Sequence, residues 1–166
     1  ELAYNTVTID RLEDKRPTFL MIHPKTDWNN AFEVNNQLDE LLLHGVYNVV
    51  YFEPESDTAF TEIIRKVAAK KKITILNVGG HGSIDRTTFN EKSFDESDTL
   101  DLGDEQEMKD AGLGQYLDEN AIIIMESCST GSGGREGENI ANMMSRIFSG
   151  RRVFAPKYPT SVREYL

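Results

Sequence analysis

The sequence predicts an α/β fold, a three-layer sandwich with a mainly parallel central sheet. Short apolar segments alternate with amphipathic helical segments along the chain, which is the order typical of parallel sheets with helical crossovers. The apolar segments are continuous rather than alternating in polarity, which indicates strands buried on both faces. The length of 166 residues fits one domain with a single core. We set apart a polar N-terminal segment, 1–16, and assign 17–166 to that domain.

Five short apolar segments are predicted to form the sheet. The first, 18–22, is almost entirely apolar and lies between Pro17 and Pro24, as expected for a buried strand that ends at breakers. The other segments have similar lengths and also end at polar residues, glycine or proline. The predicted strands are 18–22, 46–52, 73–78, 121–125 and 153–155.

Helical segments connect these strands. Apolar residues recur at helical spacing from Ala31 to Leu42, and Gly45 is a natural stop. Asp57 or Thr58 is expected to cap the next helix, which Lys70–Lys72 end with a charge that suits its C-terminus. The remaining helical segments are a short one at 113–117 and an amphipathic one at 140–148 that Gly150 ends.

The least regular part of the sequence is 83–110. Acidic residues crowd between Asp95 and Glu107, with almost no large apolar residues among them. A segment of this composition buries little apolar surface. We therefore expect an exposed, solvated loop.

Composition narrows the classes of partner. The net charge of −10 disfavours nucleic acid, because phosphate binding needs a basic surface. No apolar stretch approaches the roughly 20 residues of a membrane helix, so we expect no membrane partner. The single cysteine excludes an intramolecular disulfide and a cysteine-based metal site, and it leaves both a cytoplasmic and a secreted location open. Because the chain begins at Glu1, we expect a fragment or an excised large subunit.

Two reactive side chains follow two of the predicted strands. Cys128 lies in a Gly/Ser-rich loop after 121–125, and His81 lies between glycines after 73–78. Both are expected at the carboxyl edge of the sheet, where parallel α/β sheets place catalytic groups. A thiol needs a nearby imidazole to attack as a thiolate, and the N–H groups of Gly82 and Cys128 would form an oxyanion hole. We prefer this dyad over a buried thiol and an unrelated loop histidine.

This arrangement resembles the caspase-like fold of cysteine peptidases, which includes caspases, metacaspases, clostripain and separases. The resemblance rests on Gly80-His81-Gly82-Ser83 after one strand and Cys128-Ser129-Thr130-Gly131 after another, and it covers about 18–155 in strand order. The histidine precedes the cysteine by 47 positions, near the roughly 50 of caspases. The resemblance implies that His81 is the general base and acid, Cys128 the nucleophile, and Gly82 a donor to the oxyanion.

The same resemblance gives Glu126 a role in specificity. Metacaspases and clostripain carry an aspartate two positions before the nucleophile, where it recognises a basic residue on the amino side of the cut. Glu126 occupies this position, so the resemblance implies a protein or peptide substrate cleaved after Arg or Lys, to which a carboxylate pairs well. The alternative for Glu126 is an ordinary surface ion pair.

The resemblance implies no required cofactor and no catalytic metal. Some metacaspases bind calcium through acidic clusters, which makes Asp95–Glu107 a candidate calcium site. Relatives also carry processing or regulatory loops in this region, which would fit autoprocessing. We favour a solvated loop or cleavage segment over calcium, because a calcium site needs oxygens that converge at fixed geometry.

Two other functions stay open. Ser129–Gly134, just before a predicted helix, could cradle a phosphate or a flavin with backbone N–H groups. The domain could also be an inactive peptidase-like scaffold, because relatives wall the substrate pocket with a sixth strand and loops where this chain has only Lys157–Leu166. The two remaining histidines, His23 and His44, are predicted to be incidental.

Overall fold

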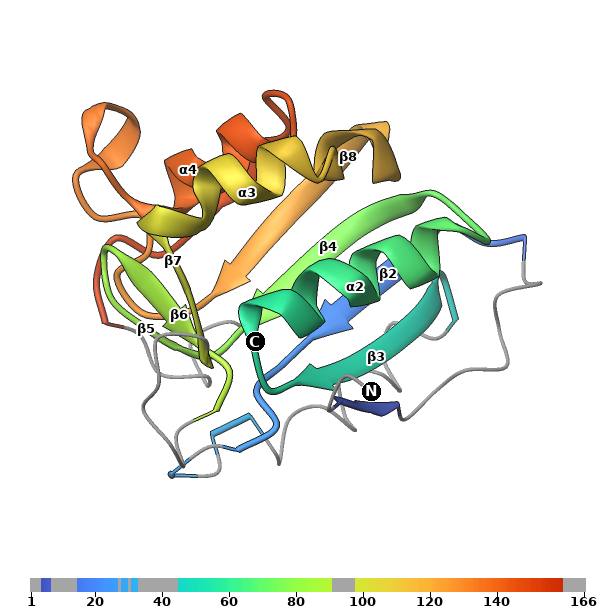
Figure 1. Ribbon diagram of the computed structural model, residues 1–166, viewed down its shortest axis with the longest axis horizontal. Helices are drawn as coiled ribbons and strands as arrows, with labels where there is room; N and C mark the ends of the chain where they lie inside the picture. Colours follow the sequence, from blue (N-terminus) through green and yellow to red (C-terminus); the bar gives the residue numbers. More distant parts are fainter. Residues whose placement is uncertain are drawn as a thin grey trace.

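The computed structural model describes residues 15–26, 28–29, 31–32, 45–90 and 98–159, together with the backbone of 4–6. A six-stranded sheet forms the centre, in the order β1-β3-β2-β4-β8-β9 (Figure 1). Strand β1 (Tyr4–Thr6) pairs antiparallel with β3 at one edge, so the segment 1–16 contributes a strand to the domain. The five parallel strands are β2 (Thr18–Ile22), β3 (Asn48–Pro54), β4 (Ile73–Gly79), β8 (Leu117–Glu126) and β9 (Arg152–Phe154).

The α/β class and the mainly parallel sheet are thus confirmed, with small shifts at the strand ends. Val46, predicted to begin the second strand, is 62% exposed, and β3 begins at Asn48 instead. The chain runs from β2 outward to β3 and then returns to the other side of β2 as β4. Ligand sites of open α/β sheets lie at such a reversal of strand order, beyond the carboxyl ends of the strands.

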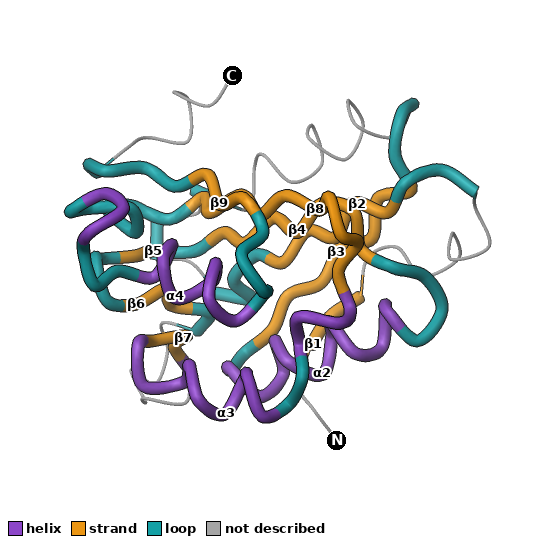
Figure 2. Tube along the Cα trace, turned by 90° about the horizontal axis from the view of Figure 1, so that it is seen from above, coloured by secondary structure: helices purple, strands orange, loops and turns teal. Residues whose placement is uncertain are grey.

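The helices α2 (Asp57–Ala68), α3 (Glu105–Asp110) and α4 (Ile140–Ile147) share one core with the same face of the sheet (Figure 2). Ser56, rather than Asp57 or Thr58, caps α2, because its hydroxyl accepts from the Ala59 N–H at 3.1 Å. The helix also ends earlier than predicted, at Ala68. No helix among the residues described is long and apolar enough to cross a membrane.

The opposite face of the sheet carries a second, smaller apolar cluster, to which Phe19, Met21, Val49, Tyr51 and Ile75 belong. The helix predicted from Ala31 to Leu42 lies mostly outside the described residues, as does His44. The described parts are consistent with a three-layer sandwich.

The prediction of an exposed loop over 83–110 is wrong for the described part of this segment. Strands β5 (His81–Gly82), β6 (Arg86–Thr88) and β7 (Thr99–Asp101) form a second sheet, and the 3-10 helix Leu102–Asp104 leads into α3. Scattered apolar residues anchor the segment, since Phe89 and Leu100 are fully buried. The short helix predicted at 113–117 is confirmed as the 3-10 helix Leu113–Tyr116.

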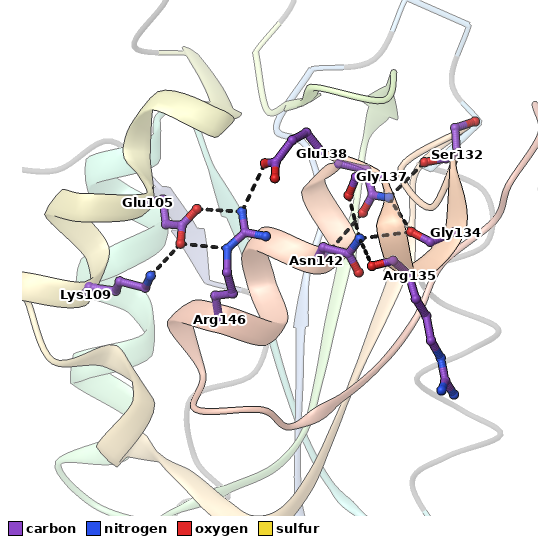
Figure 3. Close-up of polar contacts among 10 residues, drawn as sticks. Glu105, Lys109, Ser132, Gly134, Arg135, Gly137, Glu138, Asn142 and Arg146 are labelled. Atoms are coloured by element: carbon purple, nitrogen blue, oxygen red, sulfur yellow. Dashed lines mark hydrogen bonds and ion pairs between the residues drawn. The ribbon is translucent and has the colours of Figure 1, made fainter.

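Acidic residues of this region serve local structure. Asp101 and Asp104 form a reciprocal cap around the 3-10 helix Leu102–Asp104. Glu105 binds the Arg146 guanidinium through two hydrogen bonds of 2.8 and 2.7 Å, and Lys109 pairs with the same carboxylate (Figure 3). Asp95 lies outside the described residues.

Candidate active site

The two predicted catalytic residues follow neighbouring strands at matching positions. Gly79 of β4 lies opposite Glu126 of β8, and His81 and Cys128 each come two residues later. Figure 1 shows β5, which contains His81, beside the arrowhead end of β4. The parallel register therefore brings both residues to the same edge of the sheet, as the sequence predicts.

Gly82 brings the histidine segment into direct contact with the cysteine loop. A Cβ added to Gly82 would lie 2.8 Å from the Ser127 Cβ and 3.2 Å from the Cys128 carbonyl oxygen. A side chain at this position would push the two segments apart, because real Cβ atoms do not approach that closely. Glycine thus permits a close approach of backbone to backbone beside Cys128.

The turn that carries Cys128 is tightly defined. Cys128 is partly exposed, and the Thr130 hydroxyl closes the turn by donating to the Ser127 carbonyl at 2.8 Å. Ser129 has a φ of 60°, in the left-handed region, which costs an L-residue about 1–2 kcal/mol. Such strain is found where a fixed backbone serves a site.

The rest of this loop is bound to the segment 156–158. The N–H groups of Ser129 and Gly131 donate to the carbonyls of Tyr158 and Pro156, at 3.3 and 2.9 Å. The N–H groups of Ser132 and Gly134 donate to carbonyls within the loop itself. A phosphate or flavin cradle at Ser129–Gly134 would need such donors, and these four are already used.

Two asparagines tie the same loop to the start of α4, a feature that the sequence did not reveal. Asn139 caps α4 by accepting from the Asn142 N–H, and its amide donates to the Ser132 and Gly134 carbonyls at 2.8 and 3.0 Å. The Asn142 amide donates to the Gly134 and Gly137 carbonyls (Figure 3). Side-chain amides therefore hold the glycine-rich loop in one shape.

His81 lies within an aromatic surrounding. Its ring centroid is 5.7 Å from that of Trp28, which is 76% exposed, and 5.8 Å from that of Phe32. The preceding Gly80 has a φ of 151°, and an added Cβ would lie 2.6 Å from the Thr88 carbonyl oxygen. Only glycine fits there, so β6 fixes the path of the backbone that enters His81.

Glu126 lies in a buried polar network that also contains His23. The His23 Nε2 is 2.8 Å from the Asn77 Oδ1 and 3.4 Å from the Glu126 Oε2. Burial alone would raise the pKa of Glu126, but hydrogen bonds and charge from His23, with a hydrogen bond from Asn77, outweigh it and lower the pKa. Glu126 is therefore ionised at neutral pH.

His23, which the sequence predicted to be incidental, is a buried partner of Glu126 and Asn77. His23 is 1% exposed, and its ring packs edge-on against Phe32 and Tyr51, with centroids 5.6 and 5.7 Å apart. One feature of the sequence could have pointed to His23: it directly follows a predicted buried strand, at the edge where His81 and Cys128 are also expected. The surface ion pair considered for Glu126 is in fact a pair with a buried partner.

Gly79 allows this network to cross a strand. His23 follows β2 and Glu126 ends β8, with β4 between them. A Cβ on Gly79 would lie 2.8 Å from the His23 Cδ2 and 3.0 Å from Phe32. The imidazole therefore occupies the space that the side chain of any residue other than glycine would take at position 79.

Within the described residues, no three side chains of histidine, cysteine, aspartate or glutamate gather as they would around a metal ion. Comparisons of the chain with protein-family models, with curated proteins and with solved structures gave no match.

Proposed function

We propose that this domain is a cysteine endopeptidase of caspase-like fold in which His81 and Cys128 form the catalytic dyad. The observation that carries the proposal is the contact of Gly82 with Ser127 and Cys128 at the ends of two paired strands. It supports a site in which an imidazole segment and a thiol segment share one edge of the sheet. The strained turn at Ser129 and the asparagines that hold the loop further support a preorganised nucleophile.

In the proposed mechanism, His81 takes the proton of the Cys128 thiol, and the thiolate attacks the scissile carbonyl carbon. A C–S bond forms while the carbonyl π electrons move to oxygen, which the N–H groups of Gly82 and Cys128 stabilise. The imidazolium of His81 then protonates the leaving amine as the C–N bond breaks. Water, deprotonated by His81, hydrolyses the thioester, releases the carboxylic acid and restores the thiol.

Glu126 would select the residue before the cut. Its side chain is 21% exposed and its pKa is lowered, so a charged and partly exposed side chain lies two residues before the proposed nucleophile. A carboxylate there favours Arg, whose guanidinium binds it through two hydrogen bonds, and Lys, which pairs as a point charge. The proposed substrate is a protein or peptide with one of these residues before the scissile bond.

A panel of fluorogenic peptides with Arg, Lys, Asp or Leu before the cut tests this function. We expect cleavage after Arg and Lys, and a loss of about 10³-fold or more in Cys128→Ala and His81→Ala. Ser145→Ala, a small-residue change on α4, is the matched control and should cleave like the wild type. Cleavage that survives Cys128→Ala would refute the dyad, and cleavage only after Asp would refute the role of Glu126.

Alkylation of the single cysteine by iodoacetamide gives a second readout that needs no substrate. A thiolate reacts much faster than a thiol, so His81→Ala should slow alkylation near neutral pH. If no peptide is cleaved and His81→Ala leaves alkylation unchanged, the inactive scaffold replaces the peptidase.

A further inference from the structure

We propose that His23 is a positioning residue for substrate recognition, which holds the Glu126 carboxylate in the orientation that binds a basic side chain. This inference rests on the proposed peptidase function and adds to it a residue that directly follows β2. His23 acts through Glu126 and Asn77 and does not touch the reacting atoms. The contacts of these three residues carry the inference.

The direction of each hydrogen bond in the network follows from its chemistry. An ionised Glu126 can only accept hydrogen bonds, and Asn77 helps to lower its pKa, so the amide nitrogen of Asn77 is the atom that suits the side of the carboxylate. The Asn77 Oδ1 is then the acceptor that faces His23. The His23 Nε2, 2.8 Å from this oxygen, carries the proton and is the donor. The Nε2–H of His23 therefore donates to the Asn77 Oδ1, and the Glu126 Oε2 lies farther from the same nitrogen, at 3.4 Å.

The network is held rigidly from behind. Phe32 and Tyr51 pack edge-on against the His23 ring, and the backbone N–H of His23 donates to the Phe52 carbonyl at 3.1 Å. Gly79 leaves only enough space for the imidazole. A carboxylate held by such partners keeps one orientation, whereas a free glutamate loses rotamer freedom worth up to about 2 kcal/mol when it is fixed.

The exposures of the partners indicate recognition. The side chain of His23 is 2% exposed and that of Glu126 is 21% exposed, so His23 is the buried partner and Glu126 is the one that solvent reaches. A guanidinium that approaches from solvent meets a charge that is already oriented, which lowers the entropic cost of binding.

The test compares peptides with arginine or citrulline before the cut, because citrulline is a neutral analogue of nearly the same shape. Glu126→Gln should abolish the preference for arginine. His23→Leu should reduce this preference about ten- to a hundredfold, the worth of a hydrogen bond to a charged group. The loss should appear in KM for the arginine peptide, with kcat for the citrulline peptide unchanged.

Conservative and control variants separate positioning from folding. His23→Gln places an amide donor near the position of Nε2 and should retain most of the preference. Asn77→Ser, which removes the bridging amide, should lose preference like His23→Leu and replaces that variant if it does not fold. Glu119→Gln removes an exposed charge from the same strand, β8, and should change nothing.

Benzamidine binding measured by calorimetry provides a readout without catalysis. In a Cys128→Ala background, benzamidine should bind, and either Glu126→Gln or His23→Leu should weaken its binding about tenfold or more. An unchanged arginine preference in folded His23→Leu, or unchanged benzamidine binding, would overturn the inference while the peptidase stands. Benzamidine binding that depends on His23 in a protein that cleaves no peptide would overturn only the proposed function.

Discussion

The two faces of the central sheet differ in what their side chains do where the strands end. On the face that packs against α2, α3 and α4, buried apolar residues continue to the last positions, such as Val78 and Met125. On the opposite face, polar residues take over at Asn77 and Glu126. The comparison teaches that packing on one face fixes the strand ends, so that the other face can hold polar groups at set distances.

The largest expected effect is on the helix-covered face. Phe60 is fully buried and its ring stacks on that of Phe89 at 5.6 Å, so Phe60→Ala should lower the free energy of unfolding by about 3–5 kcal/mol. Urea denaturation measures this loss. The ratio of arginine to citrulline cleavage should stay at the wild-type value, and a changed ratio would show that the two faces are not independent.

The next effect is on the polar face. Gly79→Ala would force a Cβ to within 2.8 Å of His23, which should cost about 1–3 kcal/mol by overpacking. It should also lower the preference for arginine, because His23 has to move. Gly45→Ala is the matched control, since nothing lies within 4 Å of its added Cβ. Equal unfolding free energies for the two variants would contradict the proposed crossing of β4.

The two faces should respond to pH with opposite sign. Burial, with the charges of Asp101 and Asp57, raises the pKa of Asp104 to about 6, so its contribution to stability is present below its unfolded pKa and is lost as pH rises through 6. The lowered pKa of Glu126 makes a contribution that is present above its unfolded pKa and is lost as pH falls.

Unfolding free energies at about pH 4 and about pH 7 test this contrast. Between the lower and the higher pH, the unfolding free energy of Asp104→Asn should rise by about 1–2 kcal/mol relative to that of the wild type. The unfolding free energy of Glu126→Gln should fall relative to that of the wild type over the same interval. Changes of the same sign in both variants would refute the assignment of the two carboxyl groups.

The smallest expected effect is at the surface ion pair of Glu105 with Arg146, which joins α3 to α4 (Figure 3). Arg146→Gln should cost about 0.5–1 kcal/mol, as bidentate surface pairs do, and the cost should shrink in high salt. Glu138, which is 80% exposed and 3.5 Å from Arg146, provides the control. Glu138→Gln should leave thermal melting unchanged, and a larger effect there than at Arg146 would contradict the expected ranking.

Continuous apolar segments were enough to predict the five parallel strands, four of which lie between two neighbouring strands, whereas β9 lies at the edge of the sheet. The same signal failed where burial and polarity disagree. Val46 is apolar and exposed, whereas Asn48 is polar and buried. Phe89 and Leu100 are isolated among polar residues, so no periodic pattern marks the small sheet that they anchor.

For the candidate site, the sequence predicted the strand ends that carry His81 and Cys128. Glu126 was found by its distance from the cysteine, but its partner His23 was missed. His23 and Glu126 lie on either side of β4, and they come into contact because β4 ends in a glycine whose missing side chain leaves space for the imidazole. Strand order is a tertiary property that no local pattern contains, although Gly79 next to Gly80 was an unused sign of a close approach.

The bonds between the cysteine loop and 156–158 have a consequence for the order of events during synthesis. The acceptors on Pro156 and Tyr158 belong to residues that the ribosome adds after both His81 and Cys128. At a translation rate of about 5–20 residues per second, these acceptors are added a few seconds after Cys128. A nascent chain thus contains Cys128 before it can hold the cysteine loop in place, which would delay the proposed hydrolytic activity until 156–158 have been added.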